Sequence, residues 1–195
     1  MFEFIEGVLE HANPAFAVVN VNGVGYHLQI SINTYEKIKA LKQARILVHL
    51  AIKEDGHYLY GFFDEIERQL FKQLISVNGV GTGTARMILS AQTPGEIVSA
   101  ISNGNIALLR AVKGVGPKTA QRIVLELQDK VARTSNLGDV VVGTSTNKAF
   151  DEAMLALQAL GFPKSAAEKA LLKITQNNKL TLDVEVLIKE SLKIL

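Results

Sequence analysis

Two segments of the chain decide its interpretation: residues 78–89, NGVGTGTARMIL, and residues 113–124, KGVGPKTAQRIV. The second segment repeats the first, 35 residues further along the chain. Each copy follows an apolar helical run that ends in Leu-x-x-Val, at Leu74–Val77 and at Leu109–Val112. The repeated unit is therefore a helix, a Gly-Val-Gly turn and a second helix. The matching positions are Gly79, Val80, Gly81, Thr84, Ala85 and Ile88 in the first copy and Gly114, Val115, Gly116, Thr119, Ala120 and Ile123 in the second.

The Gly-Val-Gly turn is suited to bind an anion. Two glycines let the backbone approach a ligand closely, and we expect the valine between them to pack inward. The amides that start the next helix then point outward at the positive end of its dipole, where phosphate binds. Two tandem helix–hairpin–helix motifs can each hold one DNA backbone without reading base sequence. The expected phosphate contacts are Gly79, Val80, Gly81 and Thr84, then Gly114, Val115, Gly116, Lys118, Thr119 and Arg122.

Two other interpretations of these turns compete with phosphate binding. A single Gly-x-Gly turn between helices is most often only a turn, and the matched second copy argues against this. A nucleotide-binding P-loop is the alternative for residues 114–119. Its spacing fails, because a Walker A loop places four residues between its first glycine and Gly-Lys-Ser/Thr, whereas Lys118 follows Pro117. We therefore predict no ATP site and no cofactor.

The sequence before the repeat, residues 1–63, has the pattern of β-strands. Asn22-Gly23 between two apolar runs is a strong hairpin signal, because both positions tolerate a positive φ. A second hairpin is predicted at Glu54-Asp55-Gly56, with Gly56 in the left-handed region. We expect strands at residues 2–9, 15–21, 24–30, 46–53 and 57–63, with a helical stretch at residues 34–41. Five short strands predict a closed barrel of the OB type.

From residue 64 the apolar period becomes helical. Asp64 with Glu67 predicts one helix start, Thr93-Pro94-Gly95-Glu96 another, and Asn103-Gly104 a helix end. Residues 134–147 are small and polar and predict a flexible linker. Helical runs at residues 149–160, 164–175 and 182–195 predict a small bundle. The expected domains are thus 1–63, 64–133 and 148–195, in an α+β multidomain chain.

Composition limits the possible functions. The chain has 195 residues, no Cys, no Trp and a net charge of +2. Without Cys there are no disulfides, Cys-ligated zinc sites or thiol catalysis. No apolar run approaches the length of a membrane helix, so we expect a cytoplasmic protein without membrane contact. Residues 64–133 hold nine basic and six acidic side chains, a net charge of +3, which places any polyanion contact there.

These features together resemble one family, the bacterial RuvA subunits of the Holliday-junction branch-migration complex. The resemblance covers nearly the whole chain and includes a C-terminal three-helix (UBA-like) bundle. Its specific segments are residues 53–62, 67–71, 78–81, 113–120 and 156–162. It implies a homotetramer, or two stacked tetramers, that holds a four-way DNA junction open. It also implies a hexameric ATPase partner, RuvB, and a resolvase, RuvC.

The resemblance also implies residue roles outside the two turns. Glu54 and Asp55 match the acidic pair that forms a pin at the junction centre. Apolar residues of the C-terminal bundle match positions used against the motor, although each is equally compatible with a place in the bundle core. These positions are Leu157, Leu160, Phe162 and Leu192. One departure concerns Gly83, which stands where the second copy has Lys118, so the first copy is expected to bind phosphate through its backbone and Thr84.

Two further function classes stay open at this point. A helix–hairpin–helix DNA-repair enzyme, a glycosylase or nuclease, would need catalytic chemistry that the sequence lacks. The four histidines, His11, His27, His49 and His57, are widely spaced, and no cluster has metal-ligand spacing. We therefore expect no catalytic residue and no metal. A protein-binding adaptor would explain the C-terminal helices but not the repeat.

Overall fold

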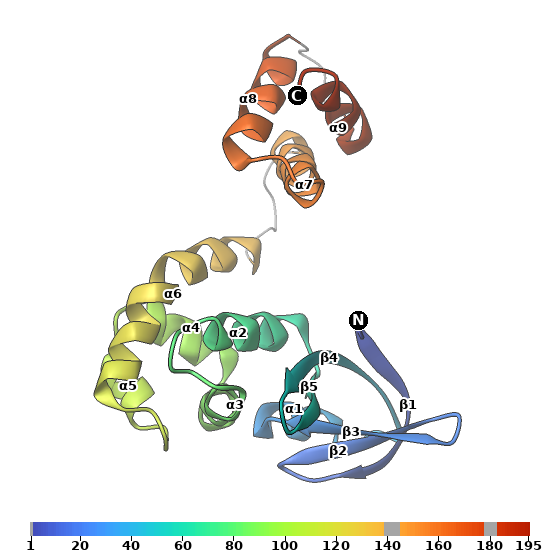
Figure 1. Ribbon diagram of the computed structural model, residues 1–195, viewed down its shortest axis with the longest axis vertical. Helices are drawn as coiled ribbons and strands as arrows, with labels where there is room; N and C mark the ends of the chain where they lie inside the picture. Colours follow the sequence, from blue (N-terminus) through green and yellow to red (C-terminus); the bar gives the residue numbers. More distant parts are fainter. Residues whose placement is uncertain (1, 139–144, 178–182) are drawn as a thin grey trace. The chain divides into compact units, whose positions relative to one another are not determined.

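The computed structural model describes residues 2–138, 145–177 and 183–195. The chain forms two compact units, residues 1–138 and residues 139–195 (Figure 1). The first contains a β-barrel and a group of helices, and the second contains three helices. Of the helices described, none combines the length and the apolar character needed to span a bilayer.

The barrel has five strands, as the sequence predicts. They are β1 (Phe4–Ala12), β2 (Phe16–Val21), β3 (Val24–Ile30), β4 (Gln43–Lys53) and β5 (Gly56–Phe62), which close in the order β1-β2-β3-β5-β4. Neighbouring strands are antiparallel except β3 and β5, which pair in parallel. A short helix, α1 (Ile32–Ile38), connects β3 to β4. The fold class predicted from the sequence is therefore confirmed for this part of the chain.

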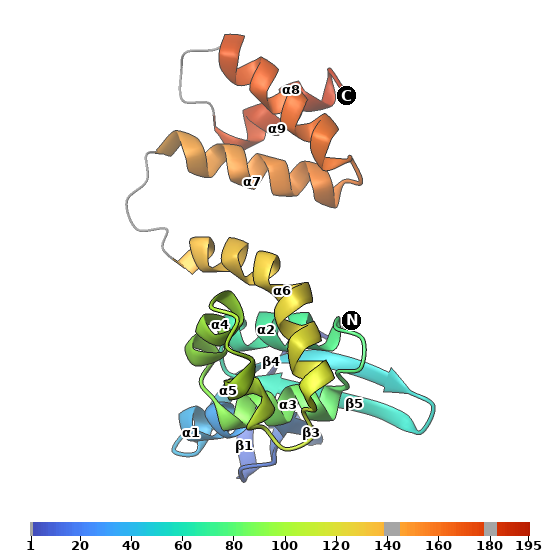
Figure 2. The ribbon, with the colours of Figure 1, turned by 90° about the vertical axis from the view of Figure 1, so that its left-hand side faces the viewer.

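Both predicted hairpins are present in the barrel. Asn22 and Gly23 have φ angles of 50° and 89°, so the first turn uses the positive φ that its sequence favours. The second turn joins β4 to β5 and projects from the barrel (Figure 2). Gly56 has a φ of 154°, a positive value that favours glycine, at the extended end of that range, and it pairs with Lys53 in the ladder.

The helical part of the first unit begins directly after β5. Its elements are α2 (Glu65–Ile75), α3 (Thr82–Ala91), α4 (Pro94–Ser102), α5 (Ile106–Arg110) and α6 (Pro117–Gly138). Asp64 caps α2 by accepting a hydrogen bond from the Glu67 amide, and Thr93 with Glu96 forms a complete capping box on α4. Asn103 ends α4, followed by Gly104 at φ 66°. The three helix boundaries predicted from these residues are confirmed.

The strand β5 and these helices share a hydrophobic core that includes Phe71 of α2, and a second core fills the inside of the barrel. The ring of Phe71 lies 5.0 Å from Tyr60 and 4.9 Å from Phe62, both on β5, and 5.5 Å from His49 on β4, measured between ring centroids. Residue 63 therefore marks the change from strand to helix, while packing joins the two parts into one unit.

A buried carboxylate adds a polar link between barrel and helices. Glu67 of α2 has no exposed surface and accepts hydrogen bonds from the hydroxyls of Ser31 and Thr34, the latter at 2.7 Å. The Thr34 hydroxyl in turn accepts the amide of Phe63 at 3.1 Å. Burial raises the pKa of Glu67 above its ordinary value, and the two hydroxyls act in the opposite direction. Beside it, Lys37 pairs with Asp64.

Arg68 makes a second polar link to the barrel. Its guanidinium donates to the carbonyl of Glu3 at 3.1 Å and pairs with the carboxylates of Glu3 and Glu65. The hydrogen bond and the positive charge of Arg68 hold the pKa of Glu3 below its ordinary value. The start of β1 is thereby fastened to α2.

The second unit is the predicted three-helix bundle, formed by α7 (Ser145–Ala159), α8 (Lys164–Asn177) and α9 (Val184–Leu192). Its own core includes Ala153, Leu157, Leu171 and Leu187. The segment predicted as a linker, residues 134–147, is shorter than expected, because α6 continues to Gly138 and α7 begins at Ser145. The remaining residues of that segment, 139–144, lie outside the described residues.

Candidate nucleic-acid interface

The two Gly-Val-Gly turns have the same backbone geometry. Gly79 and Gly114 have φ angles of 89° and 90°, in the region that favours glycine. In each turn the amide of the central valine donates to the carbonyl three residues earlier, at 3.0 Å for Val80 and 3.1 Å for Val115. Both valines are buried in the shared core. As predicted, the valine anchors each turn and leaves its glycines at the surface.

The helices that follow the two turns start without a side-chain cap. Gly81 precedes α3 and Gly116 precedes α6, and a glycine has no side chain to accept the first amides. A Cβ added at either position would meet no atom within 4 Å. The other helices of the first unit are capped by the side chains of Ser31, Asp64, Thr93 and Asn105. Both helix starts therefore combine the absence of a capping side chain with open space beside the glycine, at the two positions where the sequence predicts phosphate.

Side chains around the second turn add positive charge. Lys118 is exposed and has no ion-pair partner among the described residues, and Lys113 is also exposed. Thr119 is half-buried in the first turn of α6, and Thr84 takes the equivalent place in α3. Lys113 was absent from the sequence prediction, although it directly precedes Gly114. The second turn is thus the more basic one in its own sequence.

Arg122, a predicted phosphate contact on the same helix as Lys118, reaches the first turn. Its Nη1 donates to the backbone carbonyl of Asn78 at 3.1 Å, and its Nε lies 3.8 Å from Oε1 of Glu126. Asn78 directly precedes Gly79, so the guanidinium of the second motif reaches the turn of the first. The sequence contains no signal for this contact, because the two residues are 44 positions apart.

Hydrogen bonds of two of its side chains link α3, the helix after the first turn, to the strands and loops of the barrel. The hydroxyl of Tyr60 donates to the Thr82 hydroxyl oxygen at 2.9 Å. One turn further along, Nη1 of Arg86 donates to the carbonyl of Ala15 at 2.8 Å, in the loop between β1 and β2. Sequence reasoning missed both contacts. They hold the first turn at a fixed place on the barrel.

The acidic pair lies at the tip of the projecting β4–β5 hairpin, and both side chains are exposed. The Tyr58 hydroxyl donates to Oδ2 of Asp55 at 2.9 Å, and Nζ of Lys53 lies 5.1 Å from the Tyr58 ring centroid. The hydrogen bond to Asp55 and its negative charge raise the pKa of Tyr58 above its ordinary value. Asp55 is therefore held in place, while the structure gives Glu54 no partner among the described residues.

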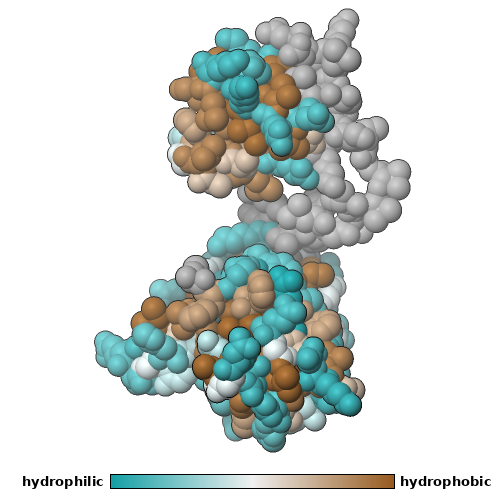
Figure 3. All heavy atoms as spheres, turned by 90° about the vertical axis from the view of Figure 1, so that its right-hand side faces the viewer, coloured by the Kyte–Doolittle hydropathy of each residue, from teal (hydrophilic) through white to brown (hydrophobic). Residues whose placement is uncertain are grey.

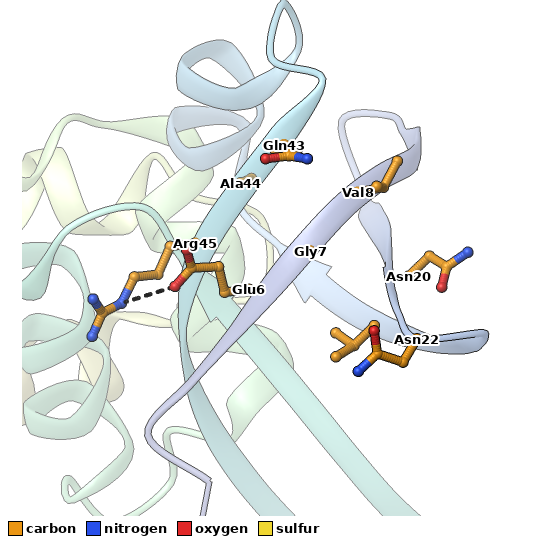
Figure 4. A pocket seen from close by; sticks show the side chains of 9 residues that line it. Glu6, Gly7, Val8, Asn20, Asn22, Gln43, Ala44 and Arg45 are labelled. Carbon is orange, nitrogen blue, oxygen red and sulfur yellow. Dashed lines mark ion pairs between the residues drawn. The ribbon is translucent and has the colours of Figure 1, made fainter.

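Among the described residues, no group of potential metal ligands includes the residues of the two turns or of the acidic tip. Across the described ranges, no three His, Cys, Asp or Glu side chains are grouped as metal ligands. A cavity of about 340 Å³ lies on the barrel wall beside Gly7, between β1, β2 and β4 (Figure 4). Its edge carries an ion pair of Glu6 with Arg45 at 3.9 Å. The Gly-Val-Gly turns and the acidic tip do not line it.

In the second unit, the four predicted motor-binding residues divide into two groups. Leu157 has no exposed surface and belongs to the bundle core, so its predicted contact with a partner was wrong. Phe162 is half-buried against the same core. Leu160 is 60% and Leu192 44% exposed. Leu155, also 60% exposed, was missed by the sequence analysis, and Figure 3 shows apolar side chains on the surface of this unit.

Three family models match successive parts of the chain. Residues 1–61 match the RuvA N terminal domain, residues 71–129 the SAM-like helix-hairpin-helix tandem, and residues 148–195 the RuvA C-terminal domain. The middle match contains both Gly-Val-Gly turns and their helix starts. The three matches agree with the barrel, the tandem motif and the C-terminal bundle described above.

Curated relatives match nearly the whole chain. A protein of Cytophaga hutchinsonii is 42% identical over 197 residues, which cover 99% of both chains. A protein of Bacteroides thetaiotaomicron is 42% identical over 203 residues, again with 99% of both chains covered. A protein of Azobacteroides pseudotrichonymphae is 40% identical over 197 residues, with both chains fully covered. Each of these relatives is named Holliday junction branch migration complex subunit RuvA.

Proposed function

The chain belongs to the RuvA family, and on that basis we propose that it binds four-way DNA junctions and holds them open for branch migration in recombination and repair. One observation carries the proposal: two hairpins of the same geometry, each followed by an uncapped helix start, lie in one compact unit. Two matched phosphate sites on a rigid body suit the two backbones of a duplex arm.

Binding of this kind depends on the shape of the nucleic acid. The free amides and Lys118 contact phosphate oxygens, which carry no sequence information. The cationic contacts release counterions, so the affinity falls as salt rises. The protein therefore binds junctions regardless of the bases they contain.

The acidic tip of the β4–β5 hairpin selects against ordinary duplex. DNA is a dense polyanion, so carboxylates at Glu54 and Asp55 repel phosphates that approach the tip. In a homotetramer, or in two stacked tetramers, four copies of the pair surround one axis. They exclude a continuous duplex from the centre and leave room for an open crossover.

The subunit itself is non-catalytic and acts in the cytoplasm with protein partners. A hexameric ATPase, RuvB, docks on the C-terminal unit and drives the arms, and the resolvase RuvC joins the complex. The exposed residues Leu155, Leu160 and Leu192 supply the apolar surface for docking. The names of the relatives support this role over the alternative of a helix–hairpin–helix glycosylase or nuclease.

Fluorescence anisotropy with a labelled four-way junction and a matched linear duplex tests the proposal. We expect a large preference for the junction at fixed salt, with no cleavage or abasic product after incubation with or without magnesium. Cleavage would favour the repair enzyme, and equal affinity for both DNAs would refute shape-selective binding. Deleting residues 148–195 should leave junction binding intact, because the first unit has its own cores, and should abolish stimulation of the motor.

A further inference from the structure

The two hairpins differ in the charge that their own sequences supply. The first has Gly83 where the second has Lys118, and Met87 where the second has Arg122. The two turns nevertheless agree in the φ angle of the first glycine and in the hydrogen bond donated by the valine amide. The first hairpin thus offers bare amides to a phosphate without a cation of its own at these two positions.

Arg122 of the second motif contacts the first turn. Its Nη1 donates to the carbonyl of Asn78, the residue that opens the first turn, at 3.1 Å. A carbonyl oxygen beside an anion site would repel phosphate, and the guanidinium both occupies that oxygen and places positive charge next to Gly79. Met87 cannot return the contact, so the link runs only from the second motif to the first.

We propose that Arg122 is the cation of the first hairpin, supplied by the helix of the second. This assignment rests on the proposed DNA-binding function and refines it. A planar guanidinium has five donors, so one bond to Asn78 leaves others for a phosphate oxygen. The same bond positions the two hairpins relative to each other.

The surroundings of Arg122 allow this role. Its side chain is 50% exposed, and its ion partner Glu126 is 38% exposed at 3.8 Å, a weak surface pair. A phosphate arriving at the first turn competes easily with such a partner. The opposing interpretation pairs Arg122 with Lys118, four residues earlier on the same helix, but the guanidinium donates toward the first turn instead.

Gly83 offers a direct test, because a lysine there would restore a cation to the first hairpin itself. A Cβ at Gly83 meets no atom within 4 Å, and its φ lies outside the positive range. The test measures the slope of log affinity against log salt for a labelled four-way junction. The variants are Arg122→Ala, Gly83→Lys and the double variant, with Arg45→Ala, an arginine outside both hairpins, as control.

If Arg122 serves the first hairpin, Arg122→Ala lowers the slope by about 0.9 per protomer, the value for one phosphate contact on duplex arms. Gly83→Lys then restores about the same amount in the Arg122→Ala background but adds much less to the wild type, because the first phosphate is already neutralised there. This non-additivity is the signature of a shared site. Arg45→Ala leaves the slope unchanged.

Three results would overturn the assignment. The first is a slope that stays constant in Arg122→Ala. The second is an equal increment from Gly83→Lys in both backgrounds, which would mean that Arg122 contacts phosphate at the second hairpin. The third is a wild-type slope in Arg122→Gln, which keeps a hydrogen-bond donor for Asn78 without the charge. That result would mean that Arg122 only positions the two hairpins and does not neutralise a phosphate. Thermal unfolding of each variant checks folding. Loss of junction preference in the wild type would instead refute the proposed function.

Discussion

Replacing the buried Glu67 with Ala should destabilise the first unit by about 2–4 kcal/mol. The substitution leaves the hydroxyls of Ser31 and Thr34 without an acceptor, and each unsatisfied buried donor costs about 1–3 kcal/mol. The raised pKa of Glu67 shows that burying its carboxylate costs free energy. Removing the carboxylate removes that cost and offsets part of the destabilisation. The net effect is therefore smaller than the sum for two hydroxyls.

The conservative substitution Glu67→Gln isolates the contribution of the charge. Because the pKa of Glu67 is raised in the folded state, the folded protein binds the proton more tightly than the unfolded chain. The wild type should therefore be most stable relative to Glu67→Gln below pH 4.5. That advantage is lost as the pH rises through the folded pKa. Lys37 and Asp64, the charged neighbours, are present in both proteins and cancel in the comparison.

Urea denaturation followed by near-ultraviolet circular dichroism measures both effects. All four tyrosines, Tyr26, Tyr35, Tyr58 and Tyr60, lie in the first unit, and the chain has no Trp. In the tyrosine band, to which Phe150 and Phe162 of the second unit do not contribute, the signal therefore reports the first unit. A destabilisation of Glu67→Ala below about 0.5 kcal/mol, the range of ordinary surface substitutions, would refute the argument from buried hydroxyls. A wild-type advantage over Glu67→Gln that grows with pH would refute the sign of the linkage.

Three further predictions concern the proposed interface. Replacing Glu54 with Gln and Asp55 with Asn should raise the affinity for linear duplex and lower the ratio of junction affinity to duplex affinity, measured at fixed salt. An unchanged ratio with an intact tetramer would mean that the tip does not act as a pin. Gly114→Val should weaken binding to every DNA shape and lower the stability by about 1–3 kcal/mol, because φ is 90° at Gly114. Gly95→Ala is the tolerated control, because a Cβ added at Gly95 meets no atom within 4 Å. Asp55→Asn should lower the pKa of Tyr58 toward its ordinary value of 10.0. Alkaline titration of the tyrosine absorbance measures this pKa, and an unaltered titration curve would show that Asp55 is not the partner of Tyr58.

Local signals in the sequence predicted most of the secondary structure. The Asn22-Gly23 turn, the Thr93–Glu96 capping box and the Gly-Val-Gly turns each specify a backbone conformation within a few residues, and all are present. Gly56 also has the positive φ that its turn position predicts, although its exact value of 154° is set together with its pairing to Lys53 in the ladder.

The contacts that assemble the candidate site lie beyond such local signals. Arg122 and Asn78, Arg86 and Ala15, and Glu67 and Ser31 are separated by 44, 71 and 36 positions. No periodicity links residues so far apart, and each polar partner is a common residue type. Leu157 failed for a related reason, since an apolar residue on a short helix fits a core and an interface equally well until the packing is known.

The rings around Phe71 also determine how the first unit carries a mechanical load. A duplex arm drawn past the hairpins pulls on α3 and α6, and a close-packed interior with low compressibility passes that pull onward. The Phe71 ring contacts His49 of β4 and Tyr60 and Phe62 of β5, so these contacts offer such a force a path to the strands that carry the acidic tip. In the junction complex proposed above, hairpins and tip would therefore move together as one stiff body, and the opening at the crossover would keep its width.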